Sequence, residues 1–184
     1  MNLTGQLLIA MPSMGDPRFE RSVVYLCSHG EDGAMGLIVN KPAADVTLSD
    51  LMEQLSIEGA SRFGNYPVHF GGPVEGSRGF VLHTADYKSN LQTLRVSDDF
   101  AMTATLDVLE DMARGDGPER TMMMLGYSGW GPGQLENEIS LNGWLTAKAS
   151  KKIVFDLPDP EKWQASLKSL GIEPLMLSGS AGTA

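Results

Sequence analysis

Short apolar runs separated by glycine, proline and other turn residues are the feature that most constrains the fold of this chain. Each run is rich in aliphatic, β-branched or aromatic residues and is shorter than a typical helix, which favours a strand. The predicted strands span residues 5–11, 22–29, 34–41, 67–70, 79–84, 93–96, 120–128 and 151–156. Apolar residues spaced three or four apart predict helices at residues 47–55, 103–115, 132–141 and 159–171.

The order of these elements favours an α+β fold. Strands outnumber helices, and the segment GEDG at residues 30–33 joins two of them as a hairpin, so a doubly wound sheet is disfavoured. Two of the helix starts carry capping signals, namely Thr47 with Asp50 three residues later, and Asp159 followed by Pro160. The length suits one domain, placed at residues 1–177, and the small polar residues 178–184 are predicted to form a flexible tail.

The charge balance makes nucleic acid an unfavourable partner. The formal net charge is −9, whereas nucleic-acid binding depends on clustered Lys and Arg. No apolar run approaches the ~20 residues needed to cross a membrane, and the first residues lack the basic start of a signal peptide. Cys27 is the only cysteine, which fits a reducing compartment. We therefore expect a cytoplasmic protein, and we predict neither a cofactor nor a metal site.

The segment LGYSGWGPGQLENEI, residues 125–139, places a serine among glycines between a predicted strand and a predicted helix. A nucleophile elbow would need glycine where Trp130 stands, and no histidine follows residue 83 to complete a triad in the usual order. Ser128 is therefore interpreted mainly as a turn residue. The glycines are interpreted as permitting sharp turns and close backbone approach, with Trp130 and Trp144 buried around the turn. If Gly129 and Gly131 have positive φ, replacing either with valine should strain the backbone.

The other glycine-rich segment and the reactive side chains give weak signals. Residues 71–76 have the spacing of a phosphate-binding loop, but they lack its Lys-Ser/Thr pair. Cys27 and His29 lie on one face of a predicted strand and are a possible thiolate–imidazole pair. A strand cysteine is more often a small buried hydrophobe, which is the favoured interpretation.

Three segments together resemble the YqgE/AlgH family of bacterial proteins. They are residues 7–42 (LLIAMPSMGDPRFERSVVYLCSHGEDGAMGLIVNKP), residues 68–83 (VHFGGPVEGSRGFVLH), and residues 125–139 with NGWL at 142–145. The resemblance covers residues 3 to 155. It implies a cytoplasmic α+β protein whose mixed, bifurcated sheet partly closes into a small barrel packed with helices. Some relatives are labelled as transcriptional regulators, and the resemblance implies no agreed catalytic residues.

The leading functional hypothesis is a non-catalytic module that binds a small molecule or a protein and acts in regulation. It rests on polar motif residues that fall beside glycine turns, where loops usually carry function. The candidate binding pocket comprises His29, Asn40, Gly71, Gly72, His83, Ser128, Trp130, Gln134 and Glu136. One alternative is a hydrolase or transferase that uses Ser128 or Cys27 with a histidine, and another is a regulator that contacts DNA. The oligomeric state stays open.

Overall fold

A branched sheet of ten strands organises the part of the chain that the computed structural model describes, residues 1–177. The predicted tail at residues 178–184 lies outside the described residues. The strands are β1 (Gln6–Ala10), β2 (Val23–Gly30), β3 (Gly33–Ile38), β4 (Pro42–Thr47), β5 (Pro67–Phe70), β6 (Val74–Thr84), β7 (Leu94–Arg95), β8 (Phe100–Thr103), β9 (Thr121–Trp130) and β10 (Trp144–Lys148). The α-helices are α1 (Leu48–Gln54), α2 (Asp107–Arg114), α3 (Gln134–Ser140) and α4 (Asp159–Ser169). Short 3-10 turns lie at Pro12–Met14, Pro17–Phe19, Ala60–Phe63 and Pro174–Leu177.

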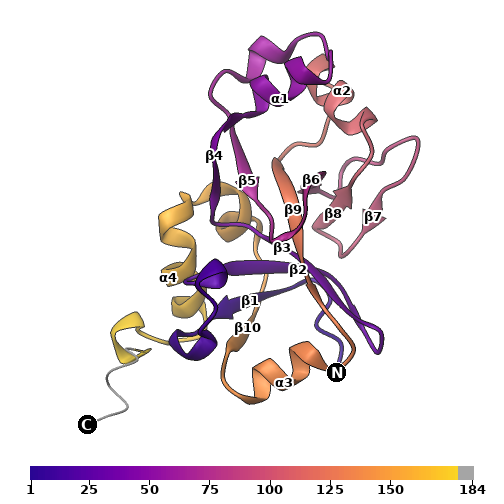
Figure 1. Ribbon diagram of the computed structural model, residues 1–184. Helices are drawn as coiled ribbons and strands as arrows, with labels where there is room; N and C mark the ends of the chain where they lie inside the picture. The colour runs from indigo at the N-terminus through magenta and orange to yellow at the C-terminus, as the bar shows by residue number, and fades with distance from the viewer. Residues whose placement is uncertain (178–184) are drawn as a thin grey trace.

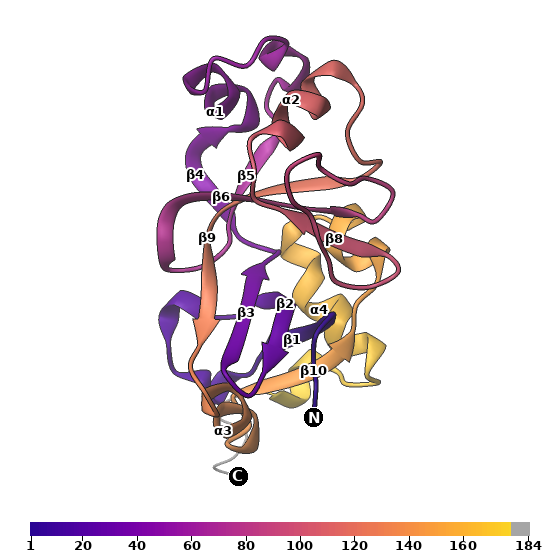
Figure 2. The same ribbon diagram turned by 90° about the vertical axis from the view of Figure 1, so that its right-hand side faces the viewer.

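The sheet branches at β9. Its main path runs β10-β1-β2-β3-β9-β6-β8-β7. β5 pairs in parallel with residues 123–125 of β9, and β3 pairs antiparallel with residues 128–130. β6 pairs with the other edge of β9. The curled sheet carries α1 and α2 at one end and α3 at the other, while α4 lies beside β1 and β2 (Figures 1 and 2). The α+β class and the bifurcated sheet are thus confirmed.

Buried side chains form separate clusters on the two faces of the sheet. Alternation along the strands sends Tyr25 and Leu37 into one cluster, which α4 covers with Trp163 and Leu167. Leu26 on β2 instead belongs to the second cluster, which lies against α3, and a third cluster joins α1 and α2 to the branch formed by β5. The sheet therefore has a buried core on each of its faces.

Glycines allow the chain to cross β9 between β5 and β6. β5 and β6 flank β9 on opposite edges, so the connection passes directly over it at Gly71 and Gly72. A Cβ atom on Gly71 would lie 2.3 Å from the carbonyl oxygen of Gly126, and one on Gly72 would lie 2.2 Å from the carbonyl carbon of Tyr127. Gly126 itself has φ +75°. The two glycine-rich segments are therefore one structural feature, in which backbone packs on backbone.

The expectation for the glycines on either side of Trp130 was wrong. Neither Gly129 nor Gly131 has a positive φ, and the nearest atom to an added Cβ is 3.4 Å away at Gly129 and 3.9 Å away at Gly131. The left-handed conformations in this segment fall at Gly126 and at Gly133, which precedes α3. Trp130 and Trp144 are buried around the turn, as predicted.

Most predicted elements are confirmed, and the differences come from tertiary pairing. The predicted strand at 151–156 is mostly a π-helical turn, Lys152–Asp156, whose Ile153 and Val154 pack into the cluster under α4. Three strands were not predicted, namely β4, β8 and β10. β8 pairs with β6, so α2 begins at Asp107 and not at residue 103. The capping box of Thr47 is present, but Asp159 caps nothing and lies in the first turn of α4.

Candidate functional site

A polar cleft with an aromatic floor opens between the loop at residues 13–19 and α3. Its volume is about 390 Å³. The loop is brought there by β1, which it follows, and α3 is brought there by β9, which ends at Trp130. The walls combine charged and apolar side chains from these segments, including Met14, Asp16, Arg18, Phe19, Val74, Trp130, Gln134 and Glu138.

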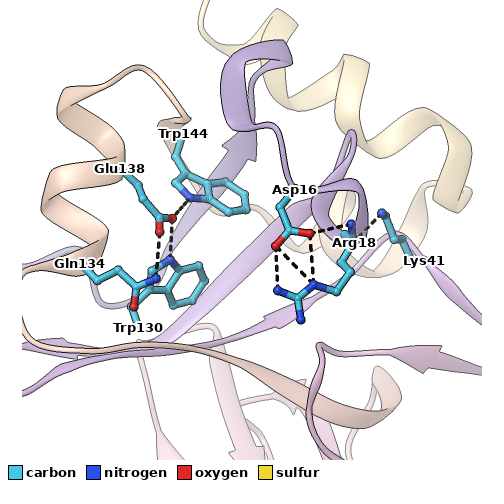
Figure 3. A network of polar contacts seen from close by, with 7 residues as sticks. All are labelled: Asp16, Arg18, Lys41, Trp130, Gln134, Glu138 and Trp144. Atoms are coloured by element: carbon cyan, nitrogen blue, oxygen red, sulfur yellow. Dashed lines mark hydrogen bonds and ion pairs between the residues drawn. The ribbon is translucent and has the colours of Figure 1, made fainter.

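Glu138 fixes the α3 side of the cleft. Its Oε1 accepts hydrogen bonds from the indole nitrogens of Trp130 and Trp144, at 3.1 and 2.9 Å. Its Oε2 accepts one from the side-chain amide of Gln134 at 3.0 Å, one turn earlier on α3. The Gln134 oxygen in turn accepts a hydrogen bond from the Gly131 amide. Because each polar group has a partner, the two indoles are held in fixed orientations (Figure 3).

An ion pair forms the opposite wall. The Arg18 guanidinium donates to both carboxylate oxygens of Asp16, with the closest contact at 2.8 Å, and this hydrogen bonding lowers the pKa of Asp16. Figure 3 shows this pair facing Trp130 and Gln134. The Lys41 ammonium donates to the Arg18 carbonyl at 3.0 Å, and burial lowers the pKa of Lys41. Arg18 is exposed, so its remaining N–H groups are available to a ligand.

A second, shallower depression of about 560 Å³ adjoins the cleft. The two share Val74, Gly129 and Trp130, so together they form one groove that bends around the end of β9. Mostly apolar side chains line the second part, where the Arg78 guanidinium lies over the Phe80 ring, 5.1 Å from its centroid. Its apolar lining is Met35, Phe80, Met102 and Tyr127.

The structure places only part of the predicted pocket at this groove. Trp130 and Gln134 line it directly. Glu136 points elsewhere, because its carboxylate accepts a hydrogen bond from the His29 Nε2 at 2.7 Å, which lowers the pKa of Glu136. His29 Nδ1 accepts from the Leu3 amide, so the histidine ties the N-terminal residues to α3. These two residues support the α3 wall without facing a ligand.

The other predicted residues hold the fold at separate places. Gly71, Gly72 and the fully buried Ser128 form the strand crossing, where the Ser128 hydroxyl donates to the Gly71 carbonyl at 3.1 Å. Asn40 accepts from the Val23 amide and donates to the Arg21 carbonyl, which clamps the start of β2.

His83 lies outside the groove, in a buried chain of hydroxyl groups. Its Nδ1 lies 2.8 Å from the Thr84 carbonyl and its Nε2 lies 2.8 Å from the Thr103 hydroxyl. The Thr103 hydroxyl is in turn 2.7 Å from that of Thr93. Burial lowers the pKa of His83, so the neutral form is favoured there.

The catalytic pairings considered from the sequence do not form. Within the described residues, no ring nitrogen of His29, His69 or His83 hydrogen-bonds to Ser128 or Cys27, and His69 Nδ1 is buried without a partner. Cys27 is buried, and burial raises the pKa of its thiol to about 12, so the nucleophilic thiolate is disfavoured. The hydrolase or transferase alternative therefore lacks the geometry it requires.

A buried charge cluster was not predicted at all. His69 on β5 contacts Asp159 on α4 at 2.9 Å, and the Lys162 ammonium lies 2.9 Å from the same carboxylate. Lys162 is only 2% exposed and also donates to the Val39 carbonyl. The cluster fastens α4 to β5 and to Val39, the residue after β3. Within residues 1–177, no group of three His, Cys, Asp or Glu side chains could hold a metal ion, and no helix could cross a membrane.

The fold and groove define a small α+β protein with a half-barrel sheet and a polar, aromatic-floored groove at a strand end. A family model described as AlgH-like matches residues 7–175, and the chain belongs to this family, YqgE/AlgH, as its motifs predicted. A UPF0301 protein of Ruegeria pomeroyi is 66% identical, with both chains covered completely. The solution structure of the AlgH protein of Pseudomonas aeruginosa is 42% identical with a TM-score of 0.82, covering 100% of this chain and 97% of that one. A Corynebacterium diphtheriae protein, 22% identical with a TM-score of 0.71 over 90% of this chain and 86% of its own, shares the fold.

Proposed function

We propose that this protein is a non-catalytic binding module and that the groove around the end of β9 is its binding site. The observation that carries the proposal is the network centred on Glu138. Three donors from Trp130, Gln134 and Trp144 hold one carboxylate, and this fixes a wall of the cleft before any ligand arrives. Pre-organised polar groups beside apolar surface are what ligand pockets generally provide.

The remaining features of the groove fit binding better than chemistry. Its polar side chains mostly bond to one another and leave only N–H groups of Arg18 for a ligand, and the nucleophiles considered from the sequence are buried away from any histidine partner. A protein that does not change its ligand chemically can act only by being bound or unbound, so we propose a regulatory role. The free, buried thiol of Cys27 fits the cytoplasm as the place where it acts. The acidic chain makes DNA the least favoured ligand.

A fragment titration tests the proposal. The probes are a panel of amino acids, dipeptides, alkylamines and carboxylates at millimolar concentration, added to ¹⁵N-labelled protein. We expect some of them to shift the indole N–H resonances of Trp130 and Trp144, because both indoles bond Glu138 at the cleft. Trp163 is the internal control, since its indole bonds the Ala10 carbonyl away from the groove. A panel that moves neither cleft resonance, or that moves only residues elsewhere, contradicts the proposal.

A further inference from the structure

The groove surrounds a strand edge that is open over its last residues. β6 pairs with β9 only as far as the pair Val74–Tyr127. Beyond Tyr127, residues 128–130 pair with β3 on one side, and no strand of the described chain pairs with them on the other. Unpaired strand edges bind extended segments because they present free N–H and C=O groups.

The pairing of β3 identifies which backbone groups face the groove. Gly30 and Gly33 close a two-residue hairpin and bond each other, so alternate residues along β3 bond to β2 and to β9. Ala34 and Gly36 then bond to β9, where their partners are Trp130 and Ser128. Gly129 lies between these two partners, so its N–H and C=O point away from β3 and toward the groove. Gly129 is exposed and has no side chain to hinder approach.

The two parts of the groove lie on opposite faces of this edge. Trp130 belongs to the buried cluster on the α3 face, whereas Tyr127 packs against the cluster on the other face. An extended peptide has the same alternation, with successive side chains on opposite faces. A residue paired with Gly129 would place its side chain among the methionines and rings beside Tyr127, and its neighbours would place theirs in the polar cleft.

The charges in the cleft indicate which peptide side chains it would accept. Its ionisable side chains are Asp16, Arg18 and Glu138, which sum to one net negative charge. The second depression is lined mostly by apolar side chains, including the adaptable ones of Met35 and Met102, and its one ionisable residue is the positively charged Arg78. A basic side chain therefore complements the cleft better than an acidic one, and an apolar neighbour complements the second depression.

We infer that the groove binds an extended segment of a partner protein, which adds to the edge of β9 at Gly129 and carries an apolar residue next to a basic one. This inference rests on the proposed function and names the class of ligand. The peptide backbone would hydrogen-bond to the N–H and C=O groups of Gly129, and the two depressions would bind alternate side chains of the peptide.

Selection from a phage-displayed library of random heptapeptides tests this inference. We expect enriched peptides to contain adjacent apolar and basic residues. The Gly129→Val variant should weaken binding of a synthetic selected peptide by about tenfold or more, because the new side chain would lie beside Tyr127 and Val74 and fill the depression meant for the paired residue. Gly129 has ordinary φ, so the variant should fold, which its melting curve checks. Gly76→Val is the matched control, since an added Cβ there meets no atom within 4 Å.

Gln134→Lys supplies a second variant, which adds a positive charge at an exposed position and cancels the net negative charge of the cleft, so it should also weaken binding of a basic peptide. The inference is overturned if no peptide is enriched, or if peptides bind Gly129→Val as they bind the parent. If small fragments bind the cleft but no peptide does, the proposed binding function is supported and the peptide inference is overturned. Self-association that Gly129→Val abolishes would assign the edge to a second copy and likewise overturn it.

Discussion

Replacing Gly126 with alanine is expected to lower the free energy of unfolding by about 3–5 kcal/mol, because backbone strain and overpacking act together. Gly126 has φ +75°, and its added Cβ would lie 2.4 Å from the Gly72 carbonyl oxygen. The obstructing atom belongs to backbone that crosses β9, so it cannot rotate away. Urea denaturation followed by circular dichroism measures the loss.

Gly129→Ala is the matched control for this experiment. It adds the same methyl group three residues along the same strand, but at an ordinary φ and with 3.4 Å to the nearest atom. It should change the free energy of unfolding by less than about 1 kcal/mol. If Gly126→Ala were as stable as Gly129→Ala, the close crossing of the two glycine-rich segments would be wrong.

Asp159→Ala is expected to lower the free energy of unfolding by about 3–5 kcal/mol at neutral pH, because it leaves the buried ammonium of Lys162 without its counter-charge. Lys162 is 2% exposed, and its other described contact is the Val39 carbonyl. The variant also deprives His69 of its partner. Asp98→Ala is the control, because its ion pair with Arg95 is fully exposed and should contribute little.

The same cluster predicts a dependence on pH. Burial raises the pKa of Asp159, but the hydrogen bonds and charges of His69 and Lys162 outweigh it, so the pKa in the folded protein is below its ordinary value. The carboxylate therefore contributes stability above its unfolded pKa of about 4, and that stability is lost as the pH falls through the lower, folded value. The deficit of Asp159→Ala should shrink in acid. A deficit that stays constant between neutral pH and pH ~3 contradicts an ionic role.

The fold was predictable where local signals agree with tertiary pairing. The hairpin at 30–33 and the capping box of Thr47 both depend on neighbours in sequence, and both are present. The run at 151–156 has the composition of a strand, but short apolar runs do not distinguish a strand from a buried helical turn. β10 is a strand because it pairs with β1, for example Gln6 with Lys148. The paired residues are more than 130 positions apart, so no local sequence pattern could predict the pairing.

The candidate site was predictable only in its α3 wall. Trp130 and Gln134 stand in one glycine-rich motif, so a single segment pointed to them. Asp16 and Arg18 come from the loop after β1, which was not among the predicted site residues, and they reach the cleft because β1 and β10 pair. His69 and Asp159 are separated by 90 positions, which is why the acidic residue was interpreted as a helix cap. The open edge at Gly129 depends on where β6 stops pairing, which is a property of the assembled sheet.

Hydrogen exchange at Gly129 tests most directly whether the end of β9 is a binding edge. In the free protein, the amides of Ser128 and Trp130 should be protected, because they pair with β3, whereas the amide of Gly129 between them should exchange rapidly. Adding a groove-binding dipeptide or selected peptide at saturation should protect Gly129 and shift its resonance. An amide of Gly129 that is already as protected as its neighbours, or one that a bound ligand leaves unchanged, would contradict a binding edge at the end of β9.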